Sequence, residues 1–255
     1  MTAHDGLSQP VPITAVMLAG GLGSRLAPLT AVIPKPLVPI DNEAIAEILL
    51  RQLAHHGVQR VLVCIGYLGH LIQAVLGDGA RYGLQVQYQR EELPLGTVGP
   101  LWLVEPLLPD NFLVLNGDVL SDIDFAALLA AHRATDRTLT VATFPKQVRV
   151  DLGVLQTGAD GCVTAFVEKP AYDFEVSMGV YAMNKRVLQY FAPHTAFGFD
   201  QLVLAMLATG DPVGTFNWGH GRWLDIGRPS DYAVAQERFA AERSLYLPWE
   251  GPSAG

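Results

Sequence analysis

Residues 13–40 read ITAVMLAGGLGSRLAPLTAVIPKPLVPI. Residues 13–18 are mostly apolar and predict a buried strand, because a short apolar run that ends at a turn is typical of a covered sheet. Three glycines follow without a polar spacer, namely Gly20, Gly21 and Gly23. A backbone without side chains can approach a phosphate closely, so we expect this turn to bind an anionic group.

Two cationic side chains accompany the glycine turn. Ser24 and Arg25 follow it directly and offer a hydroxyl donor and a guanidinium fork, both suited to phosphate oxygens. Lys35 lies between Pro34 and Pro36, which fix their own φ and restrict their neighbours. We therefore expect Lys35 to be carried on a stiff extended segment that aims its ammonium group in advance.

Other glycine-loop interpretations fit the segment less well. A P-loop needs Gly-Lys-Ser/Thr inside the turn, where this chain has Ser24 and Arg25. A dinucleotide-binding turn needs a helix after the glycines and an acid after the next strand, for which Asp41 has about the right spacing. Four prolines oppose that helix, Pro28, Pro34, Pro36 and Pro39. A turn that binds nothing would leave Arg25 and Lys35 unexplained.

Composition limits the class of protein. A chain of 255 residues that is half apolar has enough material for one large domain or two small ones. No segment approaches the roughly 20 apolar residues that span a bilayer, so we expect a soluble, cytoplasmic protein without a membrane partner. Cys64 and Cys162 lie in apolar runs and are predicted to be small buried hydrophobes. The net charge of −8 argues against a nucleic-acid partner.

The order of predicted elements indicates an α/β fold. Strands are predicted at 13–18, 61–65, 84–88 and 112–115, and helices at 43–56, 69–76, 98–108 and 124–134. Short alternating runs at 138–144, 153–157, 163–167 and 175–181 predict a smaller antiparallel lobe, and further helices are expected at 185–190, 198–209 and 229–243. The prediction is a Rossmann-like, mixed but mainly parallel sheet flanked by helices.

We divide the chain accordingly. Residues 13–243 are predicted to form a single domain, with a first half (13–135), a second half (136–228) and a C-terminal helix (229–243). Residues 1–12 and 244–255 lack periodicity and carry Pro, Gly and Ser, so both are predicted to be disordered tails.

Two aspartates each close an apolar strand. Gly117 and Asp118 follow the strand at 112–115, at the carboxyl end where open α/β sheets bind ligands. Asp118 alone fits a turn cap equally well. Asp225, in WLDIGRP, has the same setting in the other half of the chain. Two carboxylates with phosphate oxygens and waters are a usual way to hold Mg²⁺, so we expect a magnesium site here.

Glu168 and Lys169, in VEKP, end another predicted strand ahead of Pro170. A lone Glu-Lys pair is usually part of a solvated face. Its place before a proline and before the SMGVYAMN strand favours a ligand role, in which Glu168 accepts sugar hydroxyls and Lys169 meets a phosphate.

With these motifs the chain resembles the sugar-1-phosphate nucleotidyltransferases, or NDP-sugar pyrophosphorylases, over residues 13–239. The motifs stand in the family's order: LAGGLGSRL, PKPLVPI, PLGTVGPL, LNGD, VEKP, SMGVYAMN and WLDIGRPSDY. The resemblance implies a nucleotide-diphospho-sugar transferase fold. It also implies a reaction of a nucleoside triphosphate with a sugar 1-phosphate that gives an NDP-sugar and pyrophosphate.

The resemblance implies that residues 13–135 are the mainly nucleotide-binding half and residues 136–228 the mainly sugar-binding half, and it implies roles for individual residues. Arg25, Lys35 and Asp118 would be catalytic, and Asp118 with Asp225 would bind Mg²⁺. The nucleotide-binding set would be Leu18, Gly20, Gly21, Gly23, Ser24, Glu91, Gly96, Thr97 and Gly117. The sugar-phosphate set would be Gly153, Glu168, Lys169 and Gly179. A homo-oligomer is compatible with the resemblance.

The loop QREELPLGTVGP is expected to pass beside the base. Gly96 permits close approach and Thr97 follows it, while Glu91 and Glu92 supply carboxylates. Guanine presents two adjacent N–H donors that one carboxylate can accept, whereas uracil and thymine present one donor between acceptors. The loop resembles that of guanylyltransferases for mannose- and heptose-type 1-phosphates, with Leu93 inserted. GTP is therefore favoured, with dTTP, UTP, CTP or ATP as alternatives, paired with a glucose-type or cyclitol 1-phosphate.

Two other functions compete with this one. A catalytically silent relative would bind nucleotide-sugar as a regulatory subunit, but such proteins tend to lose site residues, and Arg25, Lys35, Asp118 and Asp225 are all present. A nicotinamide dehydrogenase is disfavoured by the prolines after the glycine turn.

Overall fold

A central seven-stranded sheet organises the computed structural model, which describes residues 12–250. Its order is β12 (Val213–Asn217), β8 (Leu139–Arg149), β11 (Ala171–Asn184), β6 (Asn111–Asn116), β1 (Thr14–Ala19), β4 (Arg60–Ile65) and β5 (Gln85–Arg90). β11 pairs antiparallel with both of its neighbours, whereas the other pairings are parallel. The predicted mixed, mainly parallel sheet is confirmed.

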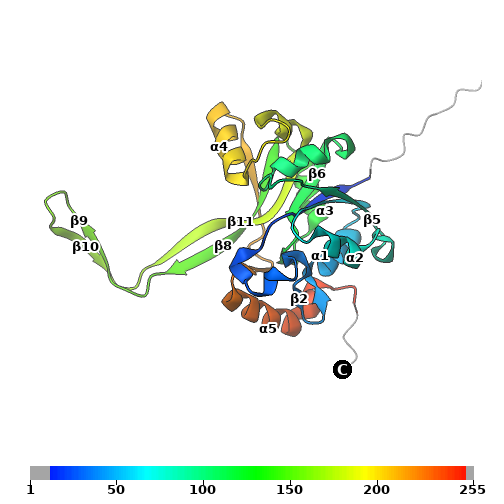
Figure 1. Ribbon diagram of the computed structural model, residues 1–255. Helices are drawn as coiled ribbons and strands as arrows, with labels where there is room; N and C mark the ends of the chain where they lie inside the picture. The colour runs from blue at the N-terminus through cyan, green and yellow to red at the C-terminus, as the bar shows by residue number, and fades with distance from the viewer. Residues whose placement is uncertain (1–11, 251–255) are drawn as a thin grey trace, which may run out of the picture.

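Helices cover both faces of the sheet (Figure 1). They are α1 (Ile45–His55), α2 (Gly69–Leu76), α3 (Phe125–Arg133), α4 (Phe199–Thr209) and α5 (Pro229–Tyr246). Side chains of β1 alternate, so that Ala15 and Met17 join the core under α1, α2 and α3, and Val16 joins the core under α4. A third apolar cluster packs α5 against α1.

Short elements connect this frame. The 3₁₀ helices that bear on the site are Ser24–Leu26, Leu29–Ala31 and Lys35–Leu37; others lie at Ala80–Tyr82, Gly99–Leu103, Glu105–Leu107 and Lys185–Tyr190. Two small antiparallel ribbons pair β2 (Pro39–Ile40) with β3 (Glu43–Ala44), and β7 (Leu120–Ser121) with β13 (Trp223–Leu224).

Two predicted helices differ in the structure. Residues 98–108 form two 3₁₀ turns instead of one α-helix, because Pro106 lacks the N–H that a continuous helix requires at that point. Residues 185–190 form a 3₁₀ helix.

The predicted C-terminal tail is corrected over residues 244–250. Helix α5 continues to Tyr246, Leu247 is fully buried, and the Trp249 ring stacks on His55 at 4.1 Å. Arg243 donates a hydrogen bond to Glu250 Oε2 over 2.8 Å. These contacts give the segment partners that its Pro- and Gly-containing sequence does not reveal. Residues 1–11 and 251–255, which make up the rest of the two predicted tails, lie outside the described residues.

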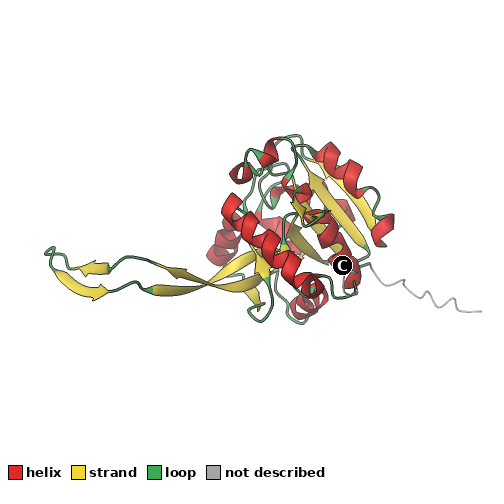
Figure 2. Ribbon diagram, turned by 90° about the horizontal axis from the view of Figure 1, so that it is seen from below, coloured by secondary structure: helices red, strands yellow, loops and turns green. Residues whose placement is uncertain are grey.

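The predicted antiparallel lobe takes the form of an arm, defined here as residues 146–174. β8 and β11 stay paired beyond the edge of the sheet, and a small ribbon of β9 (Val154–Thr157) and β10 (Val163–Val167) forms the tip. Figures 1 and 2 show the arm extending far from the body. Cys162 lies at this tip and is exposed, which corrects the expectation that it is buried; Cys64 is buried as expected. Within the described part of the chain, no helix has both the length and the apolarity to cross a membrane.

Candidate active site

A cavity of about 430 Å³ opens at the carboxyl ends of β1 and β6. The chain proceeds from β1 to β4 on one side and places β6 on the other, so the cavity occupies a topological switch point of the sheet. Its lining is Leu18, Ala19, Gly20, Gly21, Gly23, Ser24, Arg25, Lys35, Pro36, Glu91, Pro94, Gly96, Thr97, Pro100, Asn116, Gly117, Asp118 and Gly227. The structure thus brings all of the predicted nucleotide-binding and catalytic residues to one place.

The glycine turn forms one wall of the cavity. Gly23 has a φ of 62°, in the left-handed region that favours glycine, and begins the 3₁₀ helix that carries Ser24 and Arg25. Its carbonyl accepts hydrogen bonds from Leu26 N and Thr30 Oγ1, both over 2.9 Å. The turn is therefore held by its own neighbours, and its three glycines line the cavity.

Lys35 and Asp118 form an ion pair inside the cavity. Pro34 is extended, but Lys35 itself begins the 3₁₀ helix Lys35–Leu37, so the predicted extended segment is corrected to a tight turn. Pro at the second position of that helix suits the turn, since its missing N–H has no helical partner there. Asp118 reaches the same point from the end of β6, and the pair places one cation and one carboxylate side by side.

Arg25 and Asp225 meet near Gly227. A Cβ placed on Gly227 would lie 3.4 Å from Arg25 Nη1 and 2.9 Å from Asp225 Oδ1. Asp225 accepts a hydrogen bond from Gly227 N over 2.9 Å, and its other oxygen lies 3.9 Å from Lys146 Nζ. Asp225 is thus next to the cavity without lining it.

A divalent cation would find few protein ligands here. Among residues 12–250, no three His, Cys, Asp or Glu side chains converge as a metal site. The ribbon of β7 and β13 pairs Leu120 with Leu224, which brings the loops of Asp118 and Asp225 to the same end of the ribbon. Two carboxylates fit Mg²⁺, which usually takes one or two from the protein and its other ligands from phosphates and water.

Glu91 follows β5 and packs against the glycine turn. A Cβ on Gly20 would lie 2.1 Å from Glu91 Oε1, so a larger residue at this position would force the carboxylate to move. The other oxygen accepts a hydrogen bond from Leu95 N over 3.1 Å. Burial raises the pKa of the Glu91 carboxyl above its usual value, and the Leu95 hydrogen bond offsets part of that rise.

The loop after Glu91 accommodates its extra residue at the surface. Leu93 is exposed, and Glu92 is exposed and does not line the cavity. Gly96 and Thr97 return to the cavity wall, where Thr97 Oγ1 accepts a hydrogen bond from Phe199 N over 2.7 Å. Glu91 is therefore the carboxylate of this loop that lines the cavity.

The predicted sugar-phosphate residues do not join the cavity as a group. Gly179 lies against Asn116, and Asn116 lines the cavity. Gly153, Glu168 and Lys169 are instead on the arm. The physical reason is the continued pairing of β8 with β11, from Thr143 and Ser177 to Arg149 and Ala171, which carries the VEKP motif away from the sheet.

Comparison with known families agrees with this geometry. Residues 14–242 match the family model described as nucleotidyl transferase. The chain belongs to the nucleotidyl transferase family.

Named relatives of this nucleotidyl transferase differ in their nucleotides. A UTP--glucose-1-phosphate uridylyltransferase of Synechocystis is 31% identical over 86% of this chain, and a mannose-1-phosphate guanylyltransferase of Mycobacterium tuberculosis is 34% identical over 86%. The chain spans 61% and 62% of the length of these two curated relatives. A crystal structure of HddC from Yersinia pseudotuberculosis complexed with GMP-PN matches with a TM-score of 0.66 and 26% identity, over 89% of this chain and 99% of that one.

Several lining residues of the nucleotidyl transferase were missed from the sequence. Asn116 and Gly227 stand beside predicted residues in LNGD and WLDIG, so their motifs were the signal that could have found them. Ala19, Pro36, Pro94 and Pro100 complete the wall with backbone and apolar atoms, and no chemical feature of these residues distinguishes them in the sequence.

Proposed function

We propose that this nucleotidyl transferase condenses a nucleoside triphosphate with a sugar 1-phosphate to give an NDP-sugar and pyrophosphate. The favoured substrates are GTP and a manno- or heptose-type sugar 1-phosphate. The supporting observation is the convergence of the glycine turn, Arg25, Lys35 and Asp118 in one cavity at the switch point of the sheet.

The reaction needs positioning and charge neutralisation. An oxygen of the sugar 1-phosphate attacks the α-phosphorus and forms a new P–O bond, while the bond from the α-phosphorus to the bridging oxygen breaks and its electrons leave with pyrophosphate. The attacking oxygen is already ionised, so no general base is required. Arg25 and Lys35 neutralise the charge that grows on the departing pyrophosphate.

Asp118 and Asp225 would hold Mg²⁺. The ion supplies further charge neutralisation and a template for the triphosphate when it is bound. Lys35, which pairs with Asp118, lies close enough to that carboxylate to bridge it to a phosphate oxygen. The lysine thereby fixes the carboxylate before the ligands arrive.

Glu91 supports guanine as the base. Its carboxylate lies in the cavity, partly buried, with Oε1 against Gly20, and it can accept the two adjacent N–H donors of guanine. The name of the Mycobacterium tuberculosis relative and the GMP-PN complex of HddC support the same choice. The name of the Synechocystis relative supports the alternative, the same reaction with UTP and a glucose-type sugar.

The test is a matrix of five nucleoside triphosphates, GTP, UTP, dTTP, CTP and ATP, against mannose-, heptose- and glucose-type 1-phosphates with Mg²⁺. Pyrophosphate release is the readout, and we expect GTP with a manno- or heptose-type partner to be fastest. The Lys35→Ala variant is the control for contaminating activity. Nucleotide binding without pyrophosphate from any pair would contradict catalysis and favour a regulatory subunit.

A further inference from the structure

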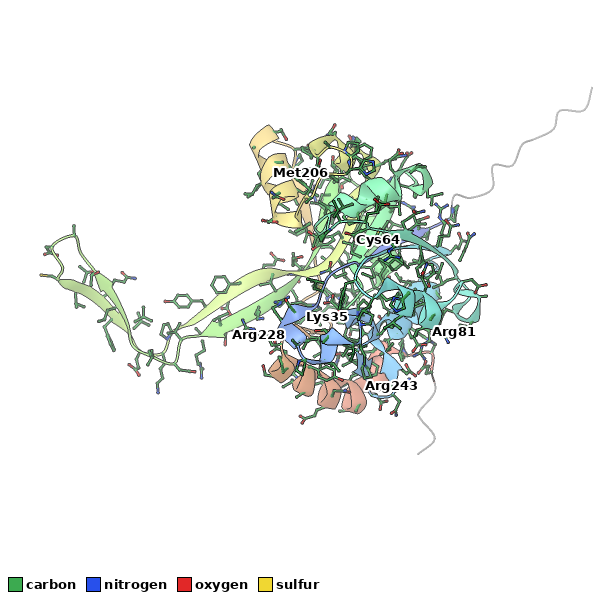
Figure 3. All side chains as sticks on the ribbon, in the orientation of Figure 1. Lys35, Cys64, Arg81, Met206, Arg228 and Arg243 are labelled. Carbon is green, nitrogen blue, oxygen red and sulfur yellow. The ribbon has the colours of Figure 1, made fainter. Side chains whose placement is uncertain are left out.

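The arm presents an apolar face that no part of residues 12–250 covers. Directly paired residues of an antiparallel ribbon share a face, so Val148 stands beside Tyr172, and Lys146 beside Phe174. The exposed fractions of Val148, Tyr172 and Phe174 are 44%, 45% and 53%. The opposite face is polar, with Gln147 Nε2 donating to Asp173 Oδ1 over 3.0 Å. The arm is therefore an amphipathic ribbon, and Figure 3 shows its side chains standing clear of the body.

The tip of the arm has the same character. Phe166 and Leu155 are paired on one face of the β9–β10 ribbon, and Phe166 is 60% exposed. A two-stranded ribbon alone is at best marginally stable in water. The tip therefore needs a surface to pack against.

The root of the arm carries its far end away from its own cavity. β8 and β11 lie between β12 and β6, so the arm prolongs two inner strands of the sheet and does not leave from a loop. Glu175 Oε1 accepts hydrogen bonds from Thr143 Oγ1 over 2.5 Å and from Asn217 Nδ2 over 2.9 Å. The ladder continues to Arg149, about 20 Å beyond Thr143 at ~3.3 Å per residue. Glu168 and Lys169 lie past its end.

Two exposed leucines stand next in sequence to residues that line the cavity. They are Leu22 in the glycine turn and Leu93 in the loop after Glu91. Their exposed side chains offer apolar surface of the same kind as the tip of the arm. The arm is roughly 30 residues long, which is the number that a stable interface of ordinary size takes from each partner.

We propose that two copies of this chain exchange arms, so that Glu168 and Lys169 of each copy complete the sugar-phosphate side of the other copy's cavity. A reciprocal exchange of identical elements closes as a two-fold dimer and leaves no free arm. The apolar face of each arm is buried together with exposed leucines near the other copy's cavity. The part of this inference that concerns Glu168 and Lys169 rests on the proposed function, whereas the dimer does not.

The decisive experiment is complementation between two inactive variants. Lys35→Ala removes the cavity lysine and keeps the arm, whereas Glu168→Gln with Lys169→Ala alters the arm and keeps the cavity. The two chains are co-expressed with different tags, and the mixed dimer is isolated by successive affinity steps. One of its two sites then contains an intact cavity and an intact arm, so we expect about half of the wild-type pyrophosphate release per dimer.

Each outcome decides the proposal. An inactive mixed dimer, or a fully active Glu168→Gln/Lys169→Ala chain, overturns the exchange, because the arm then serves its own chain or no site. If Lys35→Ala fails to fold, Arg25→Ala replaces it in the same mixture. A chain that is monomeric by light scattering at micromolar concentration also overturns it.

A second measurement separates this proposal from the proposed function. Val148→Asn with Phe174→Asn makes the arm face polar, and we expect light scattering to report a monomer. Val234→Asn on α5 is the matched control, since Val234 is 48% exposed but lies outside the arm, and it should leave the dimer intact. If the wild-type chain releases no pyrophosphate, the proposed function fails while this result still supports or overturns the dimer.

Discussion

β11 passes through two different surroundings within one strand. From Met178 to Met183 its side chains, apart from the glycine, are buried in the body, whereas from Ala171 to Glu175 they are exposed on the arm. The same partner, β8, pairs with both parts. Pairing alone therefore does not bury a strand, and the helices and neighbouring strands of the body make the difference.

The largest effect is expected on turnover, from a mutation of a charged residue that lines the cavity in the body. Arg25→Ala should lower turnover about 10³-fold, because the guanidinium acts mainly as pyrophosphate departs, while nucleotide affinity changes much less. Steady-state kinetics and direct nucleotide binding separate the two effects. Arg238→Ala, exposed on α5, is the control; unchanged turnover in Arg25→Ala would remove Arg25 from the site.

The second largest effect is expected in the free energy of unfolding, which should fall for a mutation in the body and hardly change for one on the arm. Phe112→Ala in β6 removes a fully buried ring and should cost about 3–5 kcal/mol of unfolding free energy. Phe174→Ala on the arm should change that free energy by less than about 0.5 kcal/mol. Urea unfolding at a concentration where the chain is monomeric measures both. Equal losses would mean that the arm packs on its own body.

A smaller effect is expected from the arm's charged pair. Glu168→Gln should raise the KM for the sugar 1-phosphate roughly 10- to 100-fold, since it weakens hydrogen bonds to the sugar hydroxyls. The affinity for the nucleotide should stay the same, because Glu168 does not line the cavity. Isothermal titration with nucleotide alone is the control, and a joint loss of both affinities would contradict this division of labour.

The smallest effect is expected from a mutation of Glu91, the residue proposed to recognise the base. Glu91→Gln should lower the preference for GTP over UTP about 10-fold in kcat/KM, because an amide suits uracil better than guanine. Burial raises the pKa of Glu91, so the carboxylate protonates at a higher pH than an ordinary glutamate. As the pH falls, the KM for GTP should therefore rise in the wild type and stay flat in Glu91→Gln.

The sequence predicts the body much better than the arm. Residues 13–18 and 112–115 are buried strands on apolar content alone, and the glycines and Asp118 follow them by local chain geometry. The alternation at 163–167 also predicts its strand correctly. It does not reveal whether anything covers the strand, which is why Cys162 was expected to be buried and Glu168 was expected to join the cavity.

Errors in the body have local causes. The apolar spacing at 98–108 fits a helix, but Pro106 divides it into two 3₁₀ turns. At the C-terminus, Trp249 anchors a segment whose composition is that of a loose end. Its partner His55 lies far away in the sequence, so no local pattern could show the contact.

The ribbon of β7 and β13 also determines at which stage of folding the complete site can form. Ser121 donates a hydrogen bond to the backbone oxygen of Arg222 over 2.6 Å, and 101 residues separate the two in the chain. The glycine turn and Lys35 are local, but Asp225 arrives only when this long loop has closed, and closures of that kind are slow. Thr97 in the nucleotide-binding wall waits for a partner just as distant, since Phe199 lies 102 residues along the chain. During refolding, nucleotide binding and turnover should therefore recover together, and earlier recovery of nucleotide binding would contradict this expectation.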